Sequence, residues 1–195
     1  MLLPSLTSAL ILAGLSVAQT PPGHKPEVTD RLDLIVGSKV LTVPGTALTK
    51  AETSKQPLIG TSDAPLKGTY VWIMIDQDVP SNFQNPTAGP RRANLHALIT
   101  GFTSSAERDP VHGVYLLTSP VTTPVPYTGP SPPAEVPPYP HRYVSLLYES
   151  PANFTATRAQ VGTTLPFDLA KFVNATGLTV PVRANWWAVT GEPRA

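Results

Sequence analysis

The chain has 195 residues, of which 41% are hydrophobic and 14% are charged, enough for one domain with a sizeable core. Its formal net charge of +1 excludes the surplus of Lys and Arg with which nucleic-acid binders neutralise phosphates. It contains no cysteine and 24 prolines, which excludes thiol catalysis and cysteine-ligated zinc and disfavours long helices.

The first 18 residues are typical of a secretory signal peptide. Residues 6–17 are apolar but too short to span a bilayer comfortably, and Ser16-Val17-Ala18 supplies the small residues of a cleavage site. The alternative is a buried amino-terminal helix. We expect a secreted, extracellular protein without a transmembrane segment and with a single domain over residues 19–195. The sequons at Asn153 and Asn174 predict glycosylation.

The mature chain is dominated by strand patterns. Residues 70–75 are apolar on both faces, as in a central strand that is covered on each side. Residues 167–173 form the best helix pattern, with Gly177 beyond its end. The other predicted strands are residues 32–36, 39–43, 95–100, 114–117, 143–148 and 180–189. The fold class is therefore mainly β with a few short helices.

Polar side chains gather where the central strand ends. Asp76 and Asp78 should share a face if the strand persists, because side chains alternate along a strand. The simpler alternative is that one of them caps the turn before Pro80. By the same alternation His141 and Tyr143 share a face, which leaves Arg142 on the other, where we expect a structural salt bridge.

The order of these elements resembles the phosphatidylethanolamine-binding protein family, which includes Raf kinase inhibitors and carboxypeptidase Y inhibitors. The resemblance extends from about Leu32 to Trp187. The elements that carry it are Asp76-Gln77-Asp78-Val79-Pro80, His96, Gly129-Pro130-Ser131-Pro132-Pro133 and His141-Arg142-Tyr143. It implies a β sandwich around a central antiparallel sheet, with a small anion pocket at the edge of that sheet.

The resemblance also implies which residues line the pocket. They are Asp76, Asp78, Pro80, His96, Gly129, Ser131, His141 and Tyr143. Imidazole, phenol and loop amide donors suit phosphate oxygens, whereas carboxylates orient the histidines or meet an ammonium group. For His96, a hydrogen-bonded core histidine is the alternative to a ligand contact. A zwitterionic phosphoethanolamine would fit both signs of charge.

The chain departs from the family pattern in three places. Leu95 stands where many members carry a second histidine. The long segment between Asp78 and His96 predicts a large loop near the pocket mouth. Within it, we expect Arg91-Arg92 to be a solvated pair, and attraction of an anionic ligand is the alternative. Animal members continue into a carboxy-terminal helix, and the resemblance does not include one here, so a more open site is expected.

Three functions follow from this sequence. The first is a non-enzymatic binding protein for a small phosphate-bearing anion or phospholipid head group, with no cofactor. The second is a serine carboxypeptidase inhibitor that acts through protein–protein contacts. The third and weakest is a metal-dependent hydrolase, because two aspartates and two histidines suit a divalent metal that activates water.

Overall fold

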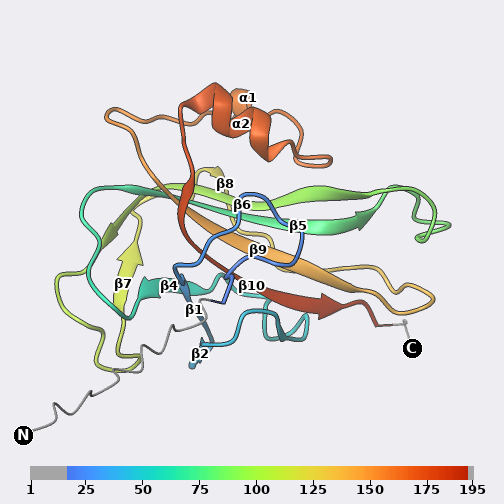
Figure 1. Ribbon diagram of the computed structural model, residues 1–195, viewed down its shortest axis with the longest axis horizontal. Helices are drawn as coiled ribbons and strands as arrows, with labels where there is room; N and C mark the ends of the chain where they lie inside the picture. The colour runs from blue at the N-terminus through green and yellow to red at the C-terminus, as the bar shows by residue number, and fades with distance from the viewer. Residues whose placement is uncertain (1–16, 193–195) are drawn as a thin grey trace, which may run out of the picture.

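The computed structural model describes residues 17–192 (Figure 1). Most of the expected signal peptide, residues 1–16, lies outside the described residues. The strands are β1 (Asp33–Val36), β2 (Lys39–Leu41), β3 (Thr46–Ala47), β4 (Leu58–Thr61), β5 (Tyr70–Pro80), β6 (Arg91–Ser104), β7 (Tyr115–Thr118), β8 (Pro124–Val125), β9 (Pro140–Glu149) and β10 (Pro181–Thr190). The helices are α1 (Arg158–Val161) and α2 (Leu169–Thr176). The prediction of a mainly β protein with short helices is confirmed.

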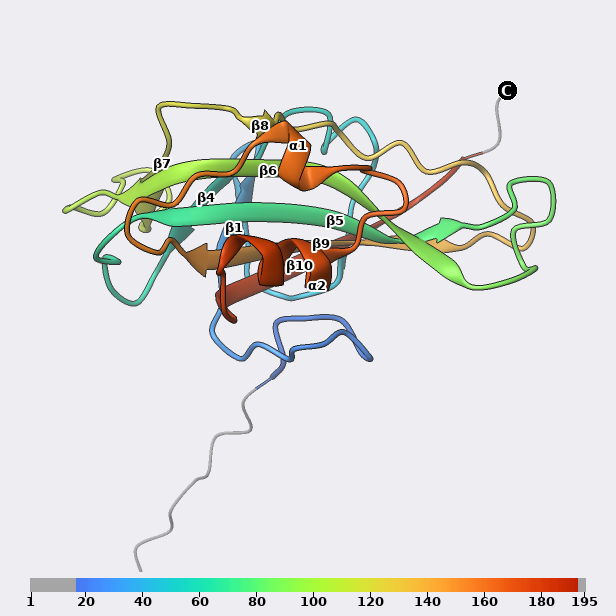
Figure 2. The ribbon, with the colours of Figure 1, turned by 90° about the horizontal axis from the view of Figure 1, so that it is seen from above.

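The strands form a continuous 10-stranded sheet in the order β2-β1-β4-β7-β6-β5-β9-β10-β3, with β8 paired to β6. The central strands β6, β5, β9 and β10 are antiparallel. The sheet folds over, so that β1, β2, β4 and β7 lie against one face of the central strands, while α1 and α2 cover the other (Figures 1 and 2). This arrangement confirms the expected sandwich.

Strand β5 contributes alternately to two cores, which explains why its sequence is apolar throughout. Tyr70, Trp72 and Met74 belong to the core between the two parts of the sheet. Val71, Ile73 and Ile75 belong to the core beneath the helices. Each such side chain, when fully buried, contributes about 1.5–3 kcal/mol to folding. The strand is thus held firmly on both sides, and its end is a rigid base for a site.

Helix α2 begins at Leu169, later than the sequence pattern over residues 167–173 predicts. Asp168 is the N-cap of α2, because its side chain accepts a hydrogen bond from the backbone N–H of Lys171. Phe167 therefore precedes the helix and packs in the helix-side core. Gly177 follows the last turn in the left-handed conformation, with φ 72°, which glycine adopts without strain.

The end of β5 differs from the sequence expectation in a way that shapes the site. The strand does not stop at Asp76 but runs to Pro80. Asp76 pairs with Asn94 and Val79 pairs with Arg92, so two residues of β5 face one residue of β6. This β-bulge inverts the alternation of side chains from Asp78 onward.

Candidate ligand-binding site

A cavity of about 270 Å³ lies beside the end of β5. It is on the face of the central strands that β1, β2, β4 and β7 cover, opposite the helices. We call it the cavity from here on. Side chains from three strands form its wall, and the proline-rich segment 128–133, together with Leu165, closes it. The polar side chains of the strands are Asp76 from β5, Asn94 and His96 from β6, and His141 and Tyr143 from β9.

His141 lies between two buried carboxylates. Its Nδ1 is 2.8 Å from Oδ2 of Asp76, and its Nε2 is 2.9 Å from Oε1 of Glu135. Burial of the ring lowers the pKa of His141, but hydrogen bonds to the two carboxylates and their charges outweigh burial and raise it. Because each ring nitrogen faces a carboxylate oxygen, the protonated form of the ring donates both of its N–H groups to protein acceptors.

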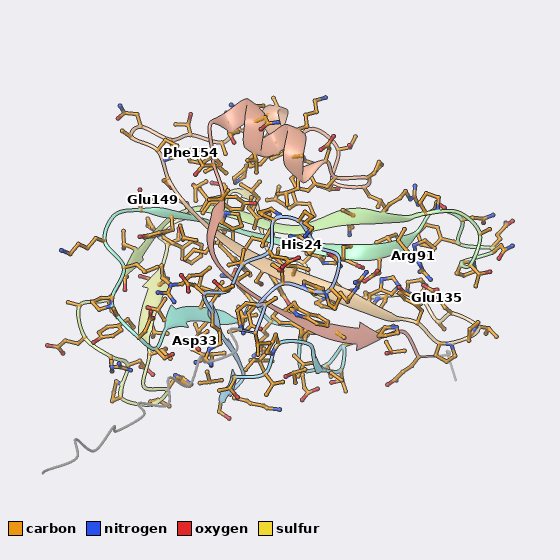
Figure 3. All side chains as sticks on the ribbon, in the orientation of Figure 1. His24, Asp33, Arg91, Glu135, Glu149 and Phe154 are labelled. Atoms are coloured by element: carbon orange, nitrogen blue, oxygen red, sulfur yellow. The ribbon has the colours of Figure 1, made fainter. Side chains whose placement is uncertain are left out.

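Glu135 continues this network to Arg91. The two Glu135 oxygens each accept a hydrogen bond of 2.7 Å from the guanidinium, and the ring of Tyr139 lies 4.0 Å from Arg91 Cζ. The hydrogen bonds from Arg91 lower the pKa of Glu135, and they outweigh burial, which raises it. Figure 3 shows Arg91 and Glu135 together at this end of the molecule. The expectation of a solvated Arg91 is wrong, because Arg91 lies on β6 and pairs with a buried acid.

Glu135 was not predicted as part of the site. It is only 5% exposed, although it lies in a loop that the sequence marks as proline-rich. The available signal was a single carboxylate inside a run of prolines, six residues before His141. An acid in such a segment has few local partners, which favours a long-range one.

His96 is a satisfied histidine that also lines the cavity. Its Nδ1 is 2.8 Å from the carbonyl of Thr128, and its Nε2 is 3.0 Å from Nδ2 of Asn94. Burial lowers the pKa of His96, so the neutral ring donates to Thr128 and accepts from Asn94. The ring meets that of Tyr143 edge to face at 5.1 Å. Burial and the charge of Asp76 raise the pKa of Tyr143, which keeps its hydroxyl protonated as a donor.

The structure separates the two motif aspartates. The bulge turns Asp78 to the helix-side face, where both of its oxygens accept from the Arg142 guanidinium at 2.7 Å. The Arg142 backbone N–H also donates to Asp78, at 2.8 Å. The expectation that Asp76 and Asp78 share a face is therefore wrong. Arg142 makes the structural salt bridge that was expected of it, and neither Asp78 nor Pro80 lines the cavity.

The remaining predicted residues lie where the loop meets the cavity. Gly129 and Ser131 both line it. Gly129 packs closely on a neighbouring turn, since a Cβ at this position would lie 3.0 Å from the carbonyl oxygen of Thr53. Leu95, at the position of the second family histidine, is 4% exposed and belongs to the helix-side core. The polar neighbour of His96 is therefore Asn94.

Other sequence predictions concern metals, membranes and sugars. Within residues 17–192, no group of three or more His, Asp or Glu side chains has an arrangement that could hold a metal ion. In the same range no helix has the length and apolar character needed to cross a bilayer. Asn153 and Asn174 are both exposed, and their glycosylation stays a prediction.

Comparison with known proteins gives consistent matches. A family model described as phosphatidylethanolamine-binding protein matches residues 38–187. Phomoidride biosynthesis cluster protein N of Talaromyces stipitatus is 29% identical, covering 96% of this chain and 98% of that protein. A carboxypeptidase Y inhibitor, solved in complex with its proteinase, has a TM-score of 0.61 at 19% identity, with 85% of each chain covered. A phosphatidylethanolamine-binding protein from Plasmodium vivax has a TM-score of 0.49 at 19% identity, with 84% and 87% covered.

Proposed function

Because this chain belongs to the phosphatidylethanolamine-binding protein family, we propose that it is a non-enzymatic binding protein whose cavity takes a small phosphate-bearing head group. The observation that carries this proposal is the buried network Asp76–His141–Glu135–Arg91 in and behind the cavity wall. Two carboxylates and two cations balance one another there. A balanced site favours a small zwitterion such as phosphoethanolamine over a bare cation or anion.

The roles of the side chains follow from which groups are already bonded. Both N–H groups of His141 are occupied, so this ring contributes charge rather than a hydrogen bond. The residues that line the cavity and offer donors to phosphate oxygens are Asn94, Ser131 and Tyr143, and the Tyr143 hydroxyl also hydrogen-bonds to Asp76. The Asp76 carboxylate accepts from His141 and Asp78 and keeps lone pairs for an ammonium group.

Titration calorimetry with phosphoethanolamine tests the proposal. We expect Tyr143→Phe to weaken binding by about tenfold, since a hydrogen bond to a charged group is worth about 1.5–3 kcal/mol. Tyr148→Phe is the matched control, because Tyr148 lies on the same strand but belongs to the helix-side core. Equal affinity in wild type and Tyr143→Phe, or no binding in wild type, would reject the proposed ligand. Inorganic phosphate in a parallel titration separates a head-group site from a simple phosphate site.

We also propose that the protein is secreted after removal of residues 1–18. The apolar stretch 6–17 and the small residues before Gln19 support this proposal. Amino-terminal sequencing of protein recovered from the medium of a eukaryotic expression host should give a sequence that starts near Gln19. Protein retained in the cells with an intact Met1 would contradict it.

Inhibition of a serine carboxypeptidase is the second candidate function. The solved inhibitor shares the fold, and this chain exposes Phe83, by 57% of its surface, on the loop 81–90 beside the cavity. An apolar side chain at a loop tip suits insertion into a protease cleft. Peptidase assays with wild type and Phe83→Asp would test it: inhibition that Phe83→Asp abolishes supports this function, and no inhibition at micromolar protein rejects it.

A further inference from the structure

A second and larger hollow lies on the opposite face of the central sheet. Its volume is about 630 Å³, and it lies between the amino-terminal segment 22–26 and α2. We call it the groove. Figure 3 shows His24 of this segment apart from Arg91 and Glu135. Its volume falls within the range of about 300–1,000 Å³ that small-molecule sites occupy.

The walls of the groove are largely apolar. Ile75 and Tyr148 come from the central sheet, and Leu169, Ala170 and Val173 come from α2. Ile75 and Tyr148 belong to the helix-side core, and Leu169 and Val173 pack against it. An aliphatic chain laid along α2 would therefore exchange water contacts for contacts with these walls, at about 25 cal/mol for each Å² of apolar surface buried.

One end of the groove carries hydrogen-bond donors. Gln77, two residues after Ile75 on the same strand, lies on this face between His24 and Arg142. The Gln77 amide satisfies both neighbours when its oxygen accepts from Arg142 at 3.1 Å and its nitrogen donates to Nδ1 of His24 at 3.0 Å. The His24 proton is then on Nε2, which has no partner within residues 17–192. His24 is 8% exposed, so this idle donor is costly to leave unpaired.

The charges at the groove are of one sign. Its lining includes Lys25 and Arg142, and no Asp or Glu among the described residues. Asp78 neutralises Arg142 from behind, and Glu27 contacts Lys25 at 2.7 Å on the exposed side. The lining itself therefore presents N–H donors and cations, and it lacks carboxylate acceptors for a ligand cation.

We propose that the groove binds an apolar molecule that ends in one carboxylate. The aliphatic body lies along α2 between Val173 and Ile75, and the carboxylate meets the donors of Lys25, His24 and Arg142. This site is on the other face of the sheet from the cavity, so it stands independently of the proposed head-group function. It adds a second ligand class to the protein.

Calorimetric titration with dodecanoate, below its micelle concentration, tests this proposal on protein that is not glycosylated. We expect wild type to bind and Ala170→Trp, which fills the groove, to bind at least about tenfold more weakly. Ala175→Trp is the matched control, since it places the same side chain on α2 at an exposed position outside the groove. Dodecanoate binding that Ala170→Trp leaves unchanged, or no binding in wild type, overturns the proposal.

Two further measurements separate the outcomes. His24→Phe should weaken dodecanoate binding but leave dodecanol binding unchanged, and equal losses for both probes would refute the polar contact. Circular dichroism shows whether Ala170→Trp is folded, and Val173→Phe serves as a second filling variant if it is not. Sedimentation of wild type at two concentrations tests the rival occupant: dimerisation that Ala170→Trp prevents would assign the groove to a second copy and overturn the proposal.

Discussion

Replacing Glu135 by Ala should destabilise the protein more than any other single loop substitution near the cavity. The change removes two 2.7 Å hydrogen bonds to Arg91 and one 2.9 Å hydrogen bond to His141. Removing one partner of a buried ion pair costs about 3–5 kcal/mol. The Arg91 side chain is 19% exposed, so water can partly replace the Glu135 carboxylate that it loses. We therefore expect the lower end, about 3 kcal/mol.

Urea unfolding at pH 6, where His141 is charged, measures this loss through the fluorescence of the three tryptophans. The same loss should lower the melting temperature by about 6–12 °C in a chain of this size. Glu107→Ala is the control: Glu107 is exposed, its carboxylate bonds to no other described residue, and its removal should change stability by less than about 0.5 kcal/mol. A loss below about 1 kcal/mol for Glu135→Ala, with an unchanged urea dependence, would refute the coupling of Arg91, Glu135 and His141.

Three further predictions concern pH, packing and the bulge. Because folding raises the pKa of His141, protonation of this ring stabilises the folded state. The stabilisation is complete below pH 6.5, the pKa of histidine in the unfolded chain, and is lost as the pH rises through the pKa in the folded state. Urea unfolding from pH 5.5 to about 9 should show this decline in wild type but not in His141→Gln. A Cβ at Gly191 would collide with the carbonyl of Pro133, so Gly191→Ala should displace the proline-rich segment, cost about 1–3 kcal/mol and weaken phosphoethanolamine binding. Asp78→Asn should cost about 3 kcal/mol in urea unfolding, because Arg142 loses its charged partner, while calorimetry should give a phosphoethanolamine affinity within about twofold of wild type; a larger change would place Asp78 at the cavity.

The parts of the fold with a strong local pattern could be predicted from the sequence. The doubly apolar run 70–75 is a central strand because it packs into two cores. Residues 143–148 lie within β9, and His141 and Tyr143 share a face as alternation requires. The two-residue strand β3 and the one-turn helix α1 were missed because such short elements are held by their tertiary contacts rather than by sequence period.

The site was less predictable, because its geometry depends on contacts between distant residues. Glu135 and Arg91 are 44 positions apart, and no local pattern indicates their pairing. The bulge at Asp76 is stabilised by the side chain itself, whose Oδ1 accepts from the backbone N–H of Asp78 at 2.8 Å. Alternation along the strand therefore predicted the face of Asp76 and failed for Asp78.

The bulge at the end of β5 has a consequence for how this segment tolerates change in length. At the bulge, the side chain of Asp76 faces the cavity, whereas the side chains of Gln77 and Asp78 lie on the opposite face of the sheet. Deleting one residue here would restore plain alternation and withdraw either the partner of Arg142 or that of His24 from its place. The spacing of the two aspartates is therefore required by the register of the strand. It limits insertions and deletions at this point, in addition to placing Asp76 for ligand contact.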